Sequence, residues 1–407
     1  MNTKNFYQKL KKLESYLLSN CFFLLEKIKK NIKSLYKTFS IKSGRTINIT
    51  NLINSGEAVS KKVFKGEVYS LKQKLDIKNK KFKYLPEGIY DIPDYHIYTI
   101  KNGIIKTGTN SIFSQSGRKI TGVNFQDLPD DFRIIKNFKK IRLDKVDGNL
   151  LVLGVGLIEN NYSHAWTELA ARAYASYVSK IKYDFILIDF ENEFTRQIIK
   201  ILNLSDKKIL ISSKYTYLTA NNLIYPELIN NFKEYFINGI SIYHRKYLPS
   251  WIKSLYREAL NNLKILNTEN TFRKIYISRR DQNFRKIINE KNLIHALERK
   301  GYKTLFFEDY SVVDQIKIMQ ESNEVVAIHG AGLININFCR KGTKILELFP
   351  SNYQCAFFYM HSIMMDLEYS FYIGQAVNKL WRISPIMEDF YVDVNYIENF
   401  ISNNWEK

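Results

Sequence analysis

At positions 325–338 the chain reads VVAIHGAGLININF. Val325–Ile328 is an uninterrupted apolar run that predicts a buried strand, and the residues from Leu333 onward can start a helix. Between them, the small residues Gly330, Ala331 and Gly332 let a ligand approach the backbone, and N–H groups at a helix start attract anions. Two interpretations are open: a phosphate-binding turn, or a tight turn in which only small residues fit.

From residue 147 onward, strand-like apolar runs alternate with helical segments, which indicates parallel sheets covered by helices. The first series predicts strands 150–155, 183–189 and 208–211 with helices 163–180 and 251–263. After the polar stretch 267–270, a second series predicts strands 274–277, 303–307, 324–328 and 343–348 with helices 284–300, 311–321 and 333–340. We therefore expect an α/β protein with two doubly wound, Rossmann-like domains, 147–265 and 266–375. They should face a cleft, with ligands at the carboxyl ends of the strands.

Three further regions flank these domains. Residues 1–44 carry an apolar stripe at steps of three or four among many lysines, which predicts a basic amphipathic helix. Such a helix can lie on an anionic membrane, or its stripe can pack against protein, and both interpretations stay open. Residues 45–146 predict a small β-rich region that includes a hairpin at 95–105. Residues 376–407 predict a C-terminal helical tail.

Composition narrows the class of protein. The chain has 407 residues, 45% hydrophobic and 14% aromatic, which indicates a folded protein with sizeable cores. Its net charge of +21 suggests anionic partners. The three cysteines lack metal-ligand spacing, so we expect a reducing compartment and no disulfide framework. No apolar segment is long enough to span a bilayer, and no secretory signal is expected.

Charged residues follow two of the predicted strands in the second domain. Strand 274–277 leads into Ser278 and Arg279, with Arg285 close behind, and Glu347 lies at the end of strand 343–348. Arginines bind phosphate oxygens in pairs of hydrogen bonds, and a carboxylate suits ribose hydroxyls. Together with the turn after His329, these residues predict a nucleoside diphosphate site. The alternative is that the arginines form surface salt bridges and Glu347 makes a helix or loop contact.

These residues resemble a known family at matching spacing. The matching runs are Tyr276-Ile277-Ser278-Arg279-Arg280-Asp281, Arg285, Asn289-Glu290, Gln315, Val326 to Leu333, Asn335, Phe338, Gly342-Thr343 and Glu347-Leu348-Phe349-Pro350. They are similar to glycosyltransferase family 61, the DUF563 domain. A segment upstream, Asn161-Tyr162-Ser163-His164-Ala165-Trp166-Thr167-Glu168, resembles another family motif, although its Trp is displaced by one position.

The resemblance implies a GT-B fold and inverting sugar transfer from a nucleotide sugar, a UDP-sugar being favoured, without an essential metal. It covers roughly residues 90–375 and is closer to bacterial members that act in lipopolysaccharide or capsule assembly. The acceptor would then be a glycan or lipid-linked glycan, with the protein in the cytoplasm, peripheral at the inner membrane face through the N-terminal helix. The donor-binding residues expected are Ser278, Arg279, Arg285, His329, Gly330, Ala331, Gly332, Leu333, Asn335 and Glu347.

Inverting transfer needs a general base for the acceptor hydroxyl. His164 and Glu168 lie four residues apart, on one face of a helix that follows the first strand of the first domain. We expect His164 to be the base and Glu168 to be its partner or the alternative base. The competing interpretation is a buried structural histidine and a surface glutamate.

Two alternative functions are retained. The high positive charge suits a non-catalytic binder of polyanions, but the lysines are dispersed and no nucleic-acid motif is present, so we expect no nucleic-acid partner. A degenerate scaffold is the second alternative. No Asp-x-Asp motif occurs; Asp189-Phe190-Glu191 could imitate one, but we expect no metal or other cofactor.

Overall fold

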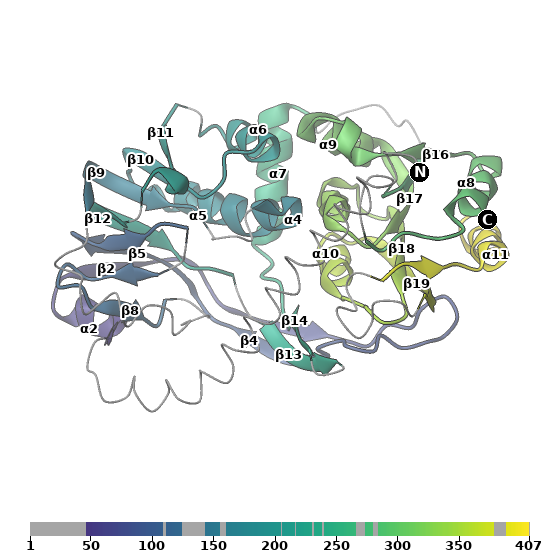
Figure 1. Cartoon of the computed structure of the whole chain (residues 1–407), viewed down its shortest axis with the longest axis horizontal. Helices are drawn as coiled ribbons and strands as arrows, with labels where there is room; N and C mark the ends of the chain where they lie inside the picture. Colours follow the sequence, from purple (N-terminus) through teal and green to yellow (C-terminus); the bar gives the residue numbers. More distant parts are fainter. Residues whose placement is uncertain are drawn as a thin grey trace, which may run out of the picture.

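The structure is a computed structural model of the chain. It describes residues 46–108, 111–123, 143–154, 160–204, 206–215, 217–229, 232–237, 240–265, 273–279, 284–377 and 388–406, apart from the side chains of 232–237 and 240–243. The amphipathic helix predicted for residues 1–44 lies outside the described residues, as do Arg280 and Asp281. The described chain is mixed α/β and forms two lobes on either side of helix α7 (Ile252–Leu263), as Figure 1 shows in purple to teal and in green to yellow.

The first lobe is built on a ten-stranded sheet. Its strands are β1 (Thr46–Asn48), β8 (Lys119–Thr121), β7 (Ile112–Phe113), β6 (Ile104–Lys106), β12 (Tyr217–Pro226), β9 (Asp144–Val152), β10 (Phe185–Ile188) and β11 (Lys208–Ile211). Strand β5 (Tyr95–Lys101) also pairs with β12, and β2 (Ala58–Phe64) pairs with β5. Strands β11, β10, β9 and β12 are neighbours in this order and mutually parallel. In sequence order this core is 3-2-1-4, an arrangement found in doubly wound α/β folds.

The predicted β-rich region at 45–146 is not a separate unit, and its predicted hairpin is wrong. Strands β5 and β6 do not pair with each other; both pair with β12, β5 along 222–226 and β6 along 217–219. Gly103 between them lies so close to β12 that a Cβ there would be 2.8 Å from that of Leu223. The chain therefore bulges at Gly103 and continues along the same neighbour instead of turning back.

The second lobe is built on a six-stranded sheet. Its order is β16 (Tyr302–Leu305), β15 (Arg273–Ile277), β17 (Ser322–Ile328), β18 (Lys344–Pro350), β19 (Glu368–Ala376) and β20 (Phe390–Tyr391). The first five strands are parallel, in the sequence order 2-1-3-4-5, and β20 is antiparallel. The order reverses between β15 and β17, and open α/β sheets bind ligands at the carboxyl ends of the strands at such a switch point.

Helices cover both faces of this second sheet. Helices α8 (Glu290–Arg299) and α11 (Val394–Asn404) pack together over one face, where Ile397, Ile401 and Trp405 join the core. The predicted C-terminal tail is thus an integral part of the second lobe. Helices α9 (Val312–Glu321) and α10 (Phe357–Met364), with the 3₁₀ segment η6 (Ala331–Phe338), cover the other face, in a core shared with the first lobe.

The remaining elements are short. The first lobe contains α2 (Ile49–Asn54), α4 (Tyr162–His164), the π-helical η3 (Ala165–Ala170), α5 (Ala171–Ser179), α6 (Glu193–Ile201) and the 3₁₀ turn η4 (Ser212–Lys214), and the second lobe the 3₁₀ turn η5 (Phe307–Asp309). Elements α4, η3 and α5 follow one another without a break, in agreement with the helix predicted at 163–180. Two small antiparallel sheets pair β3 (Glu67–Leu71) with β4 (Gly88–Ile92), and β13 (Phe232–Ile237) with β14 (Ile240–Arg245).

Two predicted helices differ from the observed ones, one in where it begins and the other in its helix type. The helix expected at 284–300 begins only at Glu290, because Arg285 has φ +60°, in the left-handed region that breaks a helix. The Lys286 N–H then bonds to Asp389 (2.8 Å) instead of a helical carbonyl. The helix expected at 333–340 is the 3₁₀ segment η6, which begins two residues earlier.

Residues 72–84, here called the arm, lie between β3 and β4 and reach the second lobe (Figure 1). The Ile77 N–H donates to the carbonyl of Phe371 on β19 (2.9 Å). The ring of Phe82 stacks on that of Phe371 at 3.8 Å between centroids and meets the ring of Phe349 edge-on at 5.8 Å. The arm thus joins the two lobes through backbone and aromatic contacts.

Candidate active site

The switch point of the second sheet brings together two of the predicted segments. Ile277 on β15 pairs with Ala327 on β17, so the residues that follow the two strands emerge side by side. Arg279 Nη1 donates a hydrogen bond to the His329 carbonyl at 2.7 Å. A Cβ at Gly330 would lie 2.0 Å from the same Nη1. A larger residue at 330 would therefore force the Arg279 guanidinium group to move.

Arg279 and Arg285 carry like charges close to each other. Burial, and then the charge of Arg285, lower the pKa of Arg279 to about 9, and burial lowers that of Arg285. The Nε of each is buried and has no hydrogen-bond partner among the described residues, while each residue keeps some exposure to solvent. Because buried cations are normally paired, two arginines without an ion-pair partner among the described residues are a candidate site for an anion.

Backbone geometry and an aromatic ring hold Arg285 in place. Its φ of +60° turns the chain before α8, so the residue precedes that helix instead of lying on its first turn, as the sequence suggested. Its Cζ lies 5.6 Å from the centre of the Tyr353 ring, a cation–π contact. The ring of His329 meets the same tyrosine edge-on at 5.4 Å.

His329 and Glu347 are locked together beneath this site. His329 Nδ1 and Glu347 Oε1 are 2.5 Å apart, and Oε2 accepts a bond from Tyr369 at 2.6 Å. Burial raises the pKa of Glu347 well above its ordinary value and lowers that of His329 well below. Glu347 lies in the middle of β18 and is fully buried, not at a strand end. The Glu347 carboxyl group orients His329, and we do not assign it to a ribose.

Ser278 also bonds within the protein. It is buried, its N–H bonds to the carbonyl of Leu305 (3.0 Å) and its hydroxyl to Glu290 Oε1 (2.7 Å). The same carboxylate oxygen accepts the hydroxyl of Tyr276 at 2.7 Å. Ser278 therefore fixes the start of α8 relative to β15, and this also fixes the backbone at Arg279, the next residue.

Asn335 links the two lobes. Its Oδ1 accepts the Tyr162 hydroxyl from α4 at 2.8 Å, and its Nδ2 donates to Gln315 on α9 at 2.8 Å. The side chain is fully buried, as is that of Leu333, so both support the turn from behind. Ala331 and Gly332 keep some exposure and lie beside the arginine site. At Gly332 a Cβ would meet only Phe307 at 3.7 Å, an ordinary contact.

The predicted pairing of His164 with Glu168 is replaced by another one. Glu168 Oε1 is 2.5 Å from Nη2 of Arg245, at the end of β14, and both side chains are buried. His164 Nδ1 is buried with no hydrogen-bond partner in the described chain. Burial, and then the charge of Arg245, lower the pKa of His164 to about 4. The imidazole is thus neutral at pH 7, the form that can accept a proton.

Arg245, which sequence reasoning missed, lies where the two lobes meet. Its Cζ is 5.5 Å from the ring of Phe357 on α10, and its charge acts, after burial, to lower the pKa of His361 there. His361 Nδ1 in turn lies 2.8 Å from Asn337 Oδ1. The buried Glu168 required a cation nearby, but β14 is 77 residues away in sequence, and no local pattern indicates which cation it is.

The switch point of the first sheet, between β9 and β12, is occupied by the protein itself. Arg172 is fully buried there, and it donates to the carbonyls of Gly154 (2.6 Å) and Pro226 (3.0 Å). Its Cζ lies 4.7 Å from the centre of the Tyr225 ring. The arginine site of the second sheet is thus the more open of the two.

Comparison with known proteins gives a family match over part of the chain. Residues 162–346 match the Glycosyltransferase 61 family model. The match begins two residues before His164 and ends just before Glu347, and it contains the arginine pair and the glycine turn.

Short segments also resemble characterised proteins. One is 36% identical over 69 residues to Protein O-linked-mannose beta-1,4-N-acetylglucosaminyltransferase 2 of Xenopus tropicalis, covering 16% of this chain and 12% of that protein. The human protein of that name is 33% identical over 79 residues, 19% of this chain and 13% of its own length. Beta-1,2-xylosyltransferase RCN11 of Oryza sativa subsp. japonica is 32% identical over 92 residues, 21% of this chain and 17% of its own.

Together these matches support a glycosyltransferase. The matched segments span less than a fifth of the relatives, so the activity of any whole relative does not transfer directly. The relatives come from vertebrates and rice, and they do not support the expected bacterial type. In the portion of the chain that the structure describes, no helix has the length and apolar character of a membrane span.

Proposed function

We propose that this chain is an inverting glycosyltransferase of family 61 that moves a sugar from a nucleotide diphosphate sugar to a hydroxyl of a surface glycan. The observation that carries the proposal is the pair of largely buried arginines, Arg279 and Arg285, which form no ion pair among the described residues and lie at the switch point of a parallel sheet. A diphosphate supplies the negative charge that this pair lacks. The family match over 162–346 is independent support for the same class of reaction.

The two lobes fit a GT-B arrangement. Each contains a parallel core with a doubly wound strand order, 3-2-1-4 in the first and 2-1-3-4-5 in the second. In this proposal the second lobe binds the donor and the first lobe binds the acceptor. The base, His164, then comes from the helix that follows the first parallel strand of the acceptor lobe.

The donor diphosphate would bind between Arg279, Arg285 and the turn Gly330–Gly332. As the bond from the sugar's anomeric carbon to the diphosphate breaks, negative charge grows on the leaving oxygen, and the two guanidinium groups stabilise it. Arginine charge can do what a divalent cation does in other transferases, so we propose that no metal is needed. The favoured donor is a UDP-sugar.

His164 would take the proton of the acceptor hydroxyl as its oxygen attacks the anomeric carbon. A pKa near 4 makes the imidazole neutral at pH 7 but a weak base, so it would take the proton only as the acceptor oxygen bonds to the anomeric carbon. Glu168 would not be the base, because its carboxylate is bonded to Arg245 and is inaccessible. We propose that this ion pair fixes the helix on which His164 lies and supplies the charge that keeps the histidine unprotonated.

Thermal shift and transfer assays on the full chain test the proposal. We expect UDP and its sugars to raise the melting temperature more than GDP or CMP, and Arg279→Ala and Arg285→Ala to abolish the rise. Lys291→Ala, an exposed residue at the start of α8, is the matched control. His164→Ala should keep UDP binding but lose transfer. A folded chain that responds to no nucleotide would refute the proposal, and steeply salt-dependent DNA binding would then support the polyanion binder.

The surface-glycan acceptor and the membrane location belong to the same proposal. The net charge of +21 suits an enzyme that works beside anionic lipids or glycans, and the predicted basic helix at 1–44 would hold it there. Flotation of the full chain with vesicles tests this part. Binding to vesicles with anionic lipid but not to neutral ones is expected, and equal recovery with both contradicts it.

The transfer assay has two further outcomes. Transfer activity that His164→Ala leaves unchanged would favour another base, and no activity despite UDP binding would favour a scaffold.

A further inference from the structure

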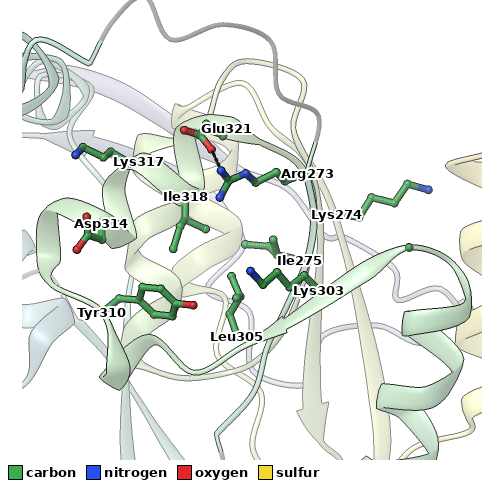
Figure 2. Close-up of a pocket in the computed structure, with 11 residues that line it drawn as sticks. Arg273, Lys274, Ile275, Lys303, Leu305, Tyr310, Asp314, Lys317, Ile318 and Glu321 are labelled. Carbon is green, nitrogen blue, oxygen red and sulfur yellow. Dashed lines mark ion pairs between the residues drawn. The ribbon is translucent and has the colours of Figure 1, made fainter.

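A cavity of about 620 Å³ lies between the edge strand β16, its neighbour β15 and helix α9. Figure 2 shows the residues that line it, which are Arg273, Lys274, Ile275, Gly301, Lys303, Leu305, Tyr310, Asp314, Lys317, Ile318 and Glu321. None of them belongs to the proposed diphosphate site. The volume is in the range of small-molecule sites.

The base of this cavity is apolar. Ile275, Leu305 and Ile318 are buried in the core and present their side chains to it. The ring of Tyr310, just before α9, forms one wall, with its hydroxyl directed into the space (Figure 2). An apolar base, an aromatic wall and a few polar groups suit the face of a sugar ring, which presents C–H groups flanked by hydroxyls.

Two of the four cations around the cavity are already paired. Arg273 lies 2.5 Å from Glu321 on α9, at the rim in Figure 2. Lys274 points away from the cavity and pairs with Glu324 (3.6 Å) and Glu406 (3.7 Å) on the other side of the strand. Neither cation is therefore left to attract a ligand strongly.

The other two cations have no such partner. Among the described residues, Lys303 and Lys317 form no ion pair. Figure 2 shows the Lys303 ammonium directed into the cavity, toward the Tyr310 hydroxyl. The nearby acid, Asp314, already accepts a bond from Ser311 at 2.6 Å as part of the helix cap. The cavity is thus positive over an apolar base.

We propose that this cavity binds an anionic saccharide, a sugar unit that carries a carboxylate or a phosphate. The Lys303 ammonium contacts the anionic group, Lys317 adds charge at the opening, and Tyr310 and the apolar base contact the ring. This site is separate from the diphosphate site and does not depend on the function proposed for it. In a polysaccharide-modifying enzyme it would hold a charged unit of the glycan away from the reacting hydroxyl.

Ligand-observed NMR titrations of the full chain test this proposal with glucuronic acid, glucose 6-phosphate and glucose as probes. We expect one or both anionic sugars to bind at least tenfold more tightly than glucose, and the stronger of the two identifies the anionic group. Lys303→Glu should weaken that binding at least tenfold, and Lys317→Glu, on a different element, should also weaken it. Lys291→Glu, with the same change of charge on α8, should leave it unchanged.

The two proposed sites can be tested independently. UDP binding should survive Lys303→Glu and disappear in Arg279→Ala, whereas the anionic sugar should show the reverse. Three results would overturn the proposal: no saturable binding of either anionic sugar, equal binding of glucose, or the same affinity in folded Lys303→Glu and Lys291→Glu proteins. None of these results bears on the nucleotide site.

Discussion

Replacement of Gly330 by alanine adds one methyl group at the place where the arginine site is tightest. The new Cβ would lie 2.0 Å from Arg279 Nη1 and 3.0 Å from its Cζ, so the guanidinium group must move. Gly330 has φ −179°, an extended conformation that alanine adopts freely, so backbone strain adds nothing. The effect is therefore a test of the arginine position alone.

The expected size follows from the contact that is lost. A hydrogen bond from a charged group, such as the one proposed from Arg279 to a diphosphate oxygen, is worth about 1.5–3 kcal/mol. At about 1.4 kcal/mol per factor of ten, diphosphate binding should weaken roughly 10- to 150-fold. Folding stability should change by about 1 kcal/mol or less, because the displaced guanidinium regains water and leaves the like charge of Arg285.

Isothermal titration calorimetry with UDP and with inorganic pyrophosphate measures the loss of affinity. Pyrophosphate has no nucleobase, so its binding does not depend on contacts to the uracil ring. Gly332→Ala is the matched control, since a Cβ there meets only Phe307 at 3.7 Å. The reasoning fails if Gly330→Ala binds pyrophosphate within twofold of the parent protein. It also fails if Gly332→Ala loses as much affinity.

The other predictions concern the contacts between the lobes. Glu168→Gln removes the negative charge that pairs with buried Arg245 and should lower the free energy of unfolding by about 3–5 kcal/mol in urea titrations; a change below about 1 kcal/mol contradicts a strong ion pair. In the unfolded chain His164 binds a proton below about pH 6.5, whereas in the folded chain it does so only near pH 4. The free energy of unfolding should therefore fall as the pH drops between these values. His164→Ala should make this fall shallower, and an unchanged slope would exclude His164 as a source. Tyr162→Phe should cost about 1 kcal/mol through its 2.8 Å bond to Asn335, and less in an Asn335→Ala background; additive effects would show no coupling.

Local sequence patterns predicted correctly those elements that depend mainly on residues near one another in the chain. Strand 208–211 was predicted at its observed limits, and the helix predicted at 311–321 is α9, which starts directly after Ser311 and is capped by its hydroxyl. The arginine site followed from a rule about parallel sheets, which places the residues after β15 and β17 at one edge. These inferences needed no knowledge of distant contacts.

The errors come from contacts between residues far apart in the chain. Gly103 was taken for a turn residue, but its closeness to Leu223 makes it a bulge in a continuous strand. Glu347 has both carboxylate oxygens bonded to side chains on neighbouring segments, which hides it from any ligand. Glu168 pairs with Arg245 from a strand that local periodicity does not connect to it. In each case the partner is chosen by the tertiary fold.

The arm at 72–84 has a practical consequence for dissecting this protein. Phe82 covers Phe371 and Phe349, and Lys78 pairs with Asp393 at 3.0 Å, although the arm precedes the second lobe by about two hundred residues. A fragment cut at the interlobe connection would present these two rings to water and would lose that ion pair. Expression of the second lobe alone should therefore fail or aggregate unless a peptide with the sequence of 72–84 is supplied with it.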